Sequence, residues 1–149
     1  MKFSDSPVAA KARIESSEQA LQRTLPDARL QVTPLPTVEQ IQLALINADY
    51  QTGPLPADVM QAVIARPAYW AFCWGSGLAL ARWLLQNPGV VAGKRVADVG
   101  CGCGIGAIAA KMAGAKEVIA CDNDQDALLS ARTNAELNNV SLAFADDVA

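Results

Sequence analysis

The sequence predicts an α/β fold with a parallel sheet. From residue 94 onward, strand-length apolar segments alternate with helix-length segments, an order that produces parallel strands joined by right-handed crossovers. A glycine-rich turn, Gly100-Cys-Gly-Cys-Gly104, follows the first of these strands and opens its helix. The chain has 149 residues, 52% of them apolar, which is enough to form one core.

Composition divides the chain into residues 1–66 and residues 67–149. The first part is more polar, is punctuated by prolines, and predicts an N-terminal extension made of helix and short strands. Pro7 suits the first turn of a helix, and Ile14 and Leu21 then recur on one helical face. The extension is therefore expected to begin with an amphipathic helix.

Two short strands are expected next in the extension. Residues 29–33 and residues 41–46 both alternate between apolar and polar side chains, which is the pattern of a half-buried strand. Thr37 and Gln40 have the spacing of a helical capping box, so a helix over the second segment stays an alternative. Residues 57–65 then predict a short helix.

An aromatic segment opens the second part of the chain. Residues 69–74 contain four aromatic side chains, and Gly75-Ser-Gly77 interrupts the chain directly after them. Ser76 is the expected N-cap of a helix that runs to about Gln86. Beyond it, the expected strands are 94–99, 117–121 and 141–145, and the expected helices are 104–113 and 124–138.

The glycine turn has a physical use as a ligand site. Glycine lets a ligand approach the backbone, and the helix N-terminus behind it offers free N–H groups. The spacing of Gly100, Gly102 and Gly104 does not fit the dinucleotide fingerprint, because residue 105 is isoleucine. Asp98, just before the turn, would repel a pyrophosphate and suits a ligand that carries an ammonium group. A glycine turn by itself is equally compatible with a plain strand-to-helix connection.

Two further acids follow the second and third strands. Asp122 ends the second strand, where a carboxylate accepts hydrogen bonds from both ribose hydroxyls. Asp146 follows the third strand on the same edge and is a candidate for binding the adenine amino group. A solvated turn aspartate is the alternative for Asp146, and Asp147 competes for the role. With Asp98, these acids describe an adenosine linked to a cationic amino-acid tail, which is S-adenosyl-L-methionine.

Trp74 joins the candidate cofactor-binding residues. Its ring is expected to cover the ligand, since a sulfonium over an aromatic face gains cation–π attraction. For Trp70, Phe72 and Trp83, a place in the core is the favoured interpretation. We expect no metal site, because the chain has no histidine and its four cysteines lack a metal-binding spacing. These cysteines are expected to be reduced and mostly buried.

Charge and hydropathy narrow the expected partners and location. The formal net charge is −3 and no cluster of Lys and Arg stands out, so nucleic acid is not an expected partner. No apolar run is long enough to span a bilayer, and the N-terminus does not read as a secretory signal. We therefore expect a cytoplasmic protein without a membrane partner.

The segment Asp98-Val-Gly-Cys-Gly-Cys-Gly104 resembles motif I of class I S-adenosylmethionine-dependent methyltransferases. Within that class, residues 41–146 resemble the seven-β-strand protein-lysine methyltransferases. They are most similar to the electron transfer flavoprotein β-subunit lysine methyltransferases and their bacterial relatives. This likeness is carried by Pro67-Ala-Tyr-Trp-Ala-Phe-Cys-Trp-Gly-Ser-Gly77, Leu80-Ala-Arg-Trp-Leu-Leu85 and Ala131-Arg-Thr-Asn-Ala-Glu-Leu-Asn138.

The resemblance implies a Rossmann-like class I methyltransferase fold with S-adenosyl-L-methionine as its cofactor. Related enzymes that methylate a ribosomal protein share motif I, so the motif does not identify the acceptor. The implied roles are the methionine end for Asp98, Gly100, Gly102 and Gly104, the ribose for Asp122, the adenine for Asp146, and the pocket lining for Trp74.

Only part of that fold is expected in this chain. The family has seven strands in the spatial order 3-2-1-4-5-7-6, and the sequence up to Ala149 accounts for the first three core strands. The fourth strand of these lysine methyltransferases carries an acidic-x-x-aromatic motif that positions the target amine. We find no counterpart to it and assign no catalytic residue. The first strand would then have an unpaired apolar edge, which predicts self-association.

The expected function is transfer of a methyl group from S-adenosyl-L-methionine to a lysine side chain of a protein substrate. A small-molecule N-methyltransferase is the alternative among enzymes. A non-catalytic cofactor-binding or interaction module is the alternative outside them. Asp98 and Ile105 disfavour a nicotinamide dehydrogenase.

Overall fold

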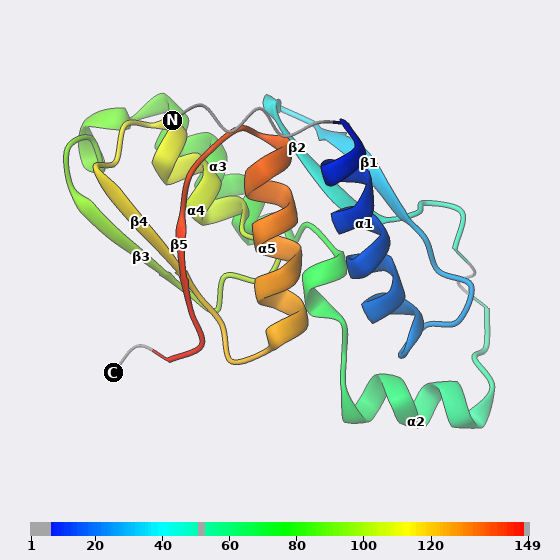
Figure 1. Cartoon of the computed structure of the whole chain (residues 1–149). Helices are drawn as coiled ribbons and strands as arrows, with labels where there is room; N and C mark the ends of the chain where they lie inside the picture. Colours follow the sequence, from blue (N-terminus) through cyan, green and yellow to red (C-terminus); the bar gives the residue numbers. More distant parts are fainter. Residues whose placement is uncertain (1–6, 51–52, 148–149) are drawn as a thin grey trace.

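The computed structural model describes residues 7–50 and 53–147 (Figure 1). Its longer elements are, in chain order, α1 (Pro7–Gln22), β1 (Leu30–Leu35), β2 (Val38–Ile46), α2 (Ala57–Ala65), α3 (Gly75–Gln86), β3 (Arg95–Val99), α4 (Ile105–Met112), β4 (Glu117–Cys121), α5 (Gln125–Leu137) and β5 (Ala143–Ala145). Two 3₁₀ turns, η1 (Tyr69–Ala71) and η2 (Pro88–Val90), flank α3.

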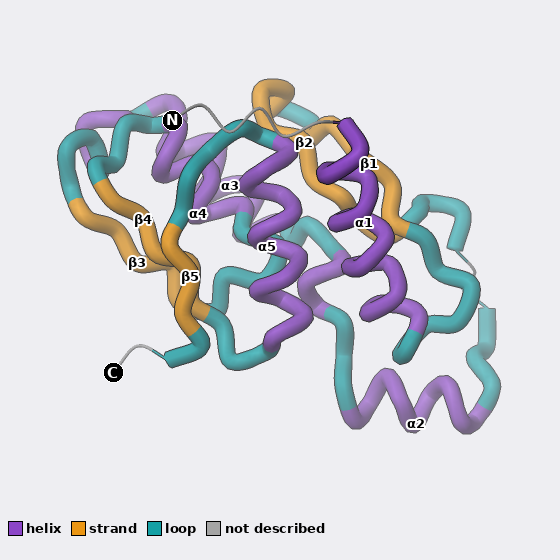
Figure 2. Tube along the Cα trace, in the orientation of Figure 1, coloured by secondary structure: helices purple, strands orange, loops and turns teal. Residues whose placement is uncertain are grey.

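The second part of the chain forms the expected parallel sheet. Its strands lie in the order β3-β4-β5, and each neighbouring pair is parallel. Helices α4 and α5 provide the crossovers, and they lie to one side of the sheet in Figure 2. Val118 and Ala120 of β4 are buried in the core that these helices share. The predicted α/β class is confirmed, with the first three strands of a Rossmann-like sheet present.

The N-terminal strands pair with each other rather than with that sheet. β1 and β2 form an antiparallel hairpin, so the strand interpretation of residues 41–46 is confirmed and the helix alternative is wrong. Thr37 lies in the hairpin turn at a φ of 65°, which is incompatible with a helical N-cap. Ile41 and Leu43 are fully buried with the exposed Gln42 between them, as the alternating pattern predicts, although Ala44 and Leu45 are both buried as well.

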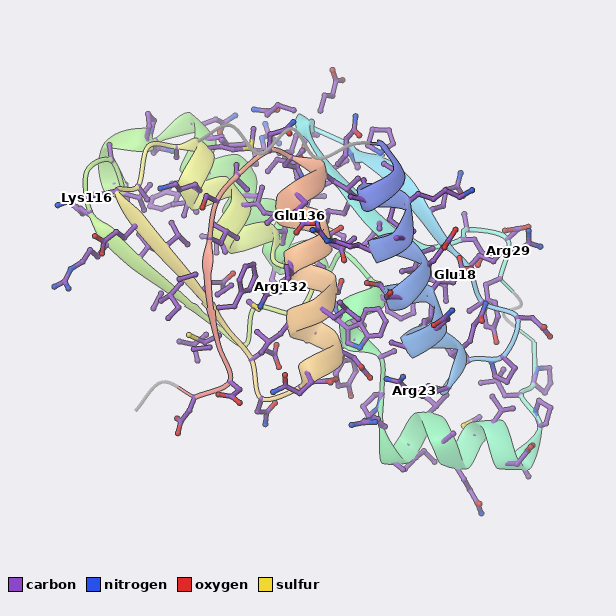
Figure 3. All side chains as sticks on the ribbon, in the orientation of Figure 1. Glu18, Arg23, Arg29, Lys116, Arg132 and Glu136 are labelled. Atoms are coloured by element: carbon purple, nitrogen blue, oxygen red, sulfur yellow. The ribbon has the colours of Figure 1, made fainter. Side chains whose placement is uncertain are left out.

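Helix α5 is the element against which the extension packs. Arg13 of α1 pairs with Glu136, and Arg23 donates to Asp126 at 2.7 Å, so both ends of α5 are linked to the N-terminal region. Figure 3 shows Arg23 and Glu136 near these two ends. On the other side of α5, the Arg132 guanidinium lies 4.3 Å from the centre of the Phe144 ring in β5. Helix α5 therefore links the extension to the sheet, and the hairpin also packs against α3 and α4.

The start of α3 differs from the expectation. Its N-cap is Trp74, which is extended (φ −74°, ψ 145°) and provides no side-chain capping bond, and Ser76 lies inside the first turn. The chain enters the helix directly from the aromatic segment, so the helix begins at Gly75 and the predicted Ser76 cap is wrong. Trp70 is 3% exposed, as expected for a core residue, whereas Phe72 and Trp83 are 38% and 48% exposed and are not in the core.

Strand β3 is an edge strand in this sheet. Lys94 O accepts from Lys116 N, and Gly100 N donates to Cys121 O, so main-chain groups of even-numbered residues point toward β4. Arg95, Ala97 and Val99 therefore direct their N–H and C=O groups away from it. Their side chains are also exposed, because they lie on the face opposite α4 and α5.

Among residues 7–50 and 53–147, no helix has the length and apolar character needed to cross a membrane.

Candidate functional site

The glycine loop between β3 and α4 is held open by its backbone. Gly100, Gly102 and Gly104 all have positive φ, at 72°, 51° and 81°. These conformations favour glycine because a side chain would clash with the local backbone. A Cβ placed on Gly100 or Gly102 would meet no atom within 4 Å, so free space lies directly against this part of the loop. Gly104 differs, because its Cβ would lie 2.9 Å from the Cβ of Ala131 in α5.

Asp122 binds the loop from the end of β4. Its Oδ2 accepts a hydrogen bond from Gly102 N at 2.9 Å, and its Oδ1 accepts from Asp124 N at 3.0 Å. A carboxylate offers about four acceptor positions, so each oxygen keeps capacity for a further donor. Asp122 therefore joins the loop to the start of α5 and still presents acceptors for hydroxyl groups. This is the chemistry expected of a ribose-binding acid.

Asp98 lies on the helix side of the same loop. Its Oδ2 accepts from Ala107 N at 2.8 Å, and a Cβ on Gly106 would lie 2.9 Å from that oxygen. The negative charge thus faces the N-terminal turn of α4, where the helix dipole is favourable to it. Burial raises the pKa of Asp98 above its ordinary value of 3.8, against the opposing effect of the Ala107 hydrogen bond, and the nearby Asp122 charge raises it further. The methionine-binding role of Asp98 stays a prediction.

A cavity of about 360 Å³ opens beside the loop at the carboxyl ends of the strands. This edge is the usual place for a ligand in an open parallel sheet. Asp146 lines the cavity and lies near α5, with a long contact of 3.4 Å from Gln125 Nε2 to its Oδ2. The residues lining it are Val99, Gly100, Cys121, Asp122, Asn123, Asp146 and Asp147. Because this lining is acidic and holds no Lys or Arg, it suits a ligand with hydroxyl or cationic groups better than a phosphate.

Trp74 lies away from that cavity. Its indole N–H donates to Tyr69 O at 2.9 Å, and its ring packs edge-on against Tyr69 with centroids 6.0 Å apart. It lines a separate apolar cavity of about 520 Å³, formed with the ends of α1 and β2 and with η1. The structure thus brings Asp98, the glycine loop, Asp122 and Asp146 together and leaves Trp74 apart. The role of Trp74 as a cofactor-pocket residue is a prediction that this arrangement does not support.

Two residues of α5 shape the loop and were not among the expected site residues. Ala131 provides the surface against which Gly104 packs. Asn134, which is 0% exposed, donates from Nδ2 to Cys103 O at 2.8 Å. The sequence feature that could have indicated Asn134 is a polar residue on the apolar face of a helix, within the segment that resembles the family's second helix. A single sequence does not show which partner such an amide binds.

The cysteines around the loop are buried thiols of low reactivity. Cys101, Cys103 and Cys121 are buried free thiols, which confirms the expected burial, and Cys73 is half-buried. Burial raises the pKa of Cys101 and of Cys103 to about 12, and the charges of Asp98 and Asp122 add to the effect at Cys101. Both stay protonated at neutral pH and are poor nucleophiles. Within the described part of the chain, no group of three or more potential ligands is arranged to hold a metal ion.

Comparison with known proteins adds sequence relationships to this geometry. Residues 80–147 match the family model for ribosomal protein L11 methyltransferase (PrmA). The electron transfer flavoprotein beta subunit lysine methyltransferase of Danio rerio is 53% identical over 73 residues, which are 49% of this chain and 28% of that protein. Its Caenorhabditis elegans homolog is 41% identical over 116 residues, which are 72% of this chain and 46% of that protein.

A solved structure also matches in part. The crystal structure of a ribosomal protein L11 methylase from Lactobacillus delbrueckii subsp. bulgaricus has a TM-score of 0.43 and 38% identity. It covers 49% of this chain and 38% of that chain. The chain spans less than half the length of these curated relatives.

Proposed function

The family matches confirm the resemblance to class I S-adenosylmethionine-dependent methyltransferases, and from this premise we propose that the chain forms the cofactor-binding part of a protein-lysine methyltransferase. S-adenosyl-L-methionine is the cofactor of that class. The curated relatives with the protein-lysine specificity in their names support the choice of acceptor. The alternatives of a small-molecule acceptor and of a non-catalytic module have no specific observation in their favour. A cytoplasmic location stays a prediction.

The observation that carries the proposal is the pairing of Asp122 with an open glycine loop. The Asp122 carboxylate fixes Gly102 and keeps free acceptor capacity on the cavity side of the sheet. Gly100 and Gly102 leave the space against the backbone empty of side chains. A nucleoside with two ribose hydroxyls and a cationic tail fits this combination of acceptors, space and negative charge.

The residues present account for binding and orientation. Asp122 would hold the ribose, Asp146 would face the adenine, and the glycine loop would pass closest to the amino-acid tail. When bound, the sulfonium cofactor supplies an activated methyl group. The chain's own contribution is to hold that group in one direction, which is the main requirement of a direct displacement.

Calorimetric titration with S-adenosylhomocysteine tests the cofactor assignment. The wild-type chain should bind, and Asp122→Ala should weaken binding at least tenfold, since it removes a charged hydrogen-bond acceptor worth about 1.5–3 kcal/mol. Asp58→Ala removes the same charge from α2 and is the control. Absence of binding by the wild-type chain, or equal affinity of the two variants, would refute the assignment. Transfer of labelled methyl to lysine in protein would then test the acceptor.

We also propose that a second copy of this chain pairs with β3. The edge groups of Arg95, Ala97 and Val99 are the template for an added strand. The amino end of β3 is basic, with Lys94 and Arg95, while the cavity at its carboxyl end is lined by acids. Antiparallel pairing about a two-fold axis would bring each basic end to the partner's acidic end. Charge complementarity thus favours a symmetric dimer through this edge.

A further inference from the structure

Asn134 lies where three parts of the fold meet. Its Oδ1 accepts a hydrogen bond from the main-chain N–H of Ala44 in β2 at 2.8 Å. Its Nδ2 donates to the main-chain carbonyl of Cys103 in the glycine loop, also at 2.8 Å. The side chain is 0% exposed, so neither bond competes with solvent. One amide of α5 therefore connects the glycine loop to the N-terminal hairpin.

Asn138, one helical turn later, provides an internal comparison. Its Oδ1 accepts from Gln42 N at 2.9 Å and its Nδ2 donates to Gln42 O at 2.6 Å. Gln42 and Ala44 are alternate residues of β2, so the two amides together bond three main-chain groups on its free edge, as part of a neighbouring strand would. Asn138 bonds Gln42 of the hairpin and the main-chain carbonyl of Asn134, while Asn134 bonds both the hairpin and the loop. Both residues thus bond the hairpin, and only Asn134 also bonds the glycine loop.

The bond to Cys103 fixes the direction of a peptide group in the loop. Cys103 is 5% exposed, so its carbonyl has little access to water if the Asn134 donor is removed. A buried carbonyl that loses its only donor tends to rotate toward solvent. Rotation of this peptide would change the conformation of Gly104, which is the N-cap of α4 at φ 81° and ψ 10°. Asn134 therefore maintains the loop geometry from α5, through its hydrogen bond to the Cys103 carbonyl.

We infer that Asn134 is a positioning residue for the cofactor loop and that it couples the β1–β2 hairpin to cofactor affinity. It acts through the Cys103 carbonyl and does not itself contact the ligand. The inference rests on the proposed function for the identity of the ligand. If Asn134 has this role, its loss lowers cofactor affinity more than the loss of Asn138, which bonds the hairpin but not the loop.

Titration of two variants with S-adenosylhomocysteine separates these effects. Asn138→Ala removes the hairpin contact and one bond within α5, to Asn134 O, and leaves the loop bond in place, whereas Asn134→Ala removes the bonds to both the hairpin and the loop. At a temperature where circular dichroism shows both variants folded, Asn134→Ala should bind roughly tenfold more weakly than the wild type. Asn138→Ala should stay within about twofold of it. Equal losses of affinity in the two variants would overturn the inference.

Amide hydrogen exchange gives a readout that does not need the variants to bind. Without ligand, Asn134→Ala should speed exchange at Gly102 N and Gly104 N, and Asn138→Ala should not. In the wild type, S-adenosylhomocysteine should slow exchange at Ala44 N, which bonds Asn134, and leave Gln42 N unchanged. That wild-type measurement decides the matter if Asn134→Ala does not fold, and an unchanged Ala44 rate would refute the coupling. If the wild type binds no ligand, the proposed function fails, and the ligand-free comparison alone decides the role of Asn134.

Discussion

Replacing Gly104 with alanine tests how closely the glycine loop is packed against α5. Gly104 has a φ of 81°, and an added Cβ would lie 2.9 Å from Ala131 Cβ and 3.1 Å from Ala131 Cα. The second contact is with backbone, so no side-chain rotation relieves it. Gly102 has a positive φ of 51° as well, but an added Cβ there would meet no atom within 4 Å. The two glycines thus share the conformational penalty and differ in steric cost.

The magnitudes follow from these two terms. A left-handed conformation costs a non-glycine residue about 1–2 kcal/mol. Overpacking of a buried contact adds about 1–3 kcal/mol. Gly104→Ala should therefore lose about 2–5 kcal/mol of unfolding free energy, and Gly102→Ala about 1–2 kcal/mol. Gly102→Ala should lose more cofactor affinity than Gly104→Ala, because its new methyl group occupies the free space against the loop where the cofactor is proposed to bind.

Urea unfolding at 25 °C, followed by circular dichroism, measures the free energies. The double variant Gly104→Ala/Ala131→Gly relieves part of the steric cost, since it removes the nearer contact, with Ala131 Cβ, and leaves the contact with Ala131 Cα. A double-mutant cycle should give a favourable coupling of about 1–3 kcal/mol, although Ala131→Gly alone costs about 1 kcal/mol in a helix. A coupling near zero would show that the loop does not pack on Ala131 and would refute the reasoning.

Three further outcomes are expected. Because burial raises the pKa of Asp98 above 3.8, the folded protein binds that proton more tightly than the unfolded chain. The wild type should therefore lose stability relative to Asp98→Asn as the pH rises from 3.8 through the folded pKa; a pH-independent difference in urea unfolding would contradict this. Burial raises the pKa of all three thiols, to about 12 for Cys101 and Cys103, but Cys73 is only half-buried, so a thiol-specific disulfide reagent at neutral pH should label native protein at Cys73 first. Mass spectrometry of the labelled protein identifies the site, and faster labelling of Cys101 or Cys103 would show that the loop opens. Ala97→Lys places two lysines opposite each other in a symmetric β3 dimer, so sedimentation velocity should show less association than for Ala79→Lys on α3; equal association would exclude the β3 edge.

The regular part of the fold was predictable because its signals are local. Residues 94–145 alternate strand and helix patterns whose period is set by the backbone, and the structure follows them within one or two residues. The glycine loop was predictable for a similar reason, since glycine is the residue type that adopts a positive φ without steric cost, as Gly100, Gly102 and Gly104 do. Asp122 could be placed because the carboxyl ends of parallel strands share one edge.

Features that depend on side-chain packing were less accessible. Ser76 has the chemistry of a helix cap, but the path of the preceding aromatic segment decides where α3 begins. The ring of Trp74 is held by Tyr69, five residues earlier, and its direction depends on a bond to a main-chain carbonyl. Phe72 and Trp83 are apolar enough for the core, yet their positions expose them. Hydrophobicity alone does not determine which aromatic side chains the core has room for.

The division between residues 1–66 and 67–149 also rests on composition, which does not show how the two parts pack together. Composition records how many polar residues a segment places on the surface, whereas packing depends on the few positions that are buried. Leu43 of the hairpin lies in the same core cluster as Ile108 of α4, and Ser17 of α1 hydrogen-bonds Thr133 of α5 at 3.1 Å in a buried contact. One turn of α5 thus contacts α1 through Thr133 and both the hairpin and the glycine loop through Asn134. A substitution in the extension that displaces α5 therefore acts on the loop without touching it, and cofactor affinity is the property in which that effect is measured.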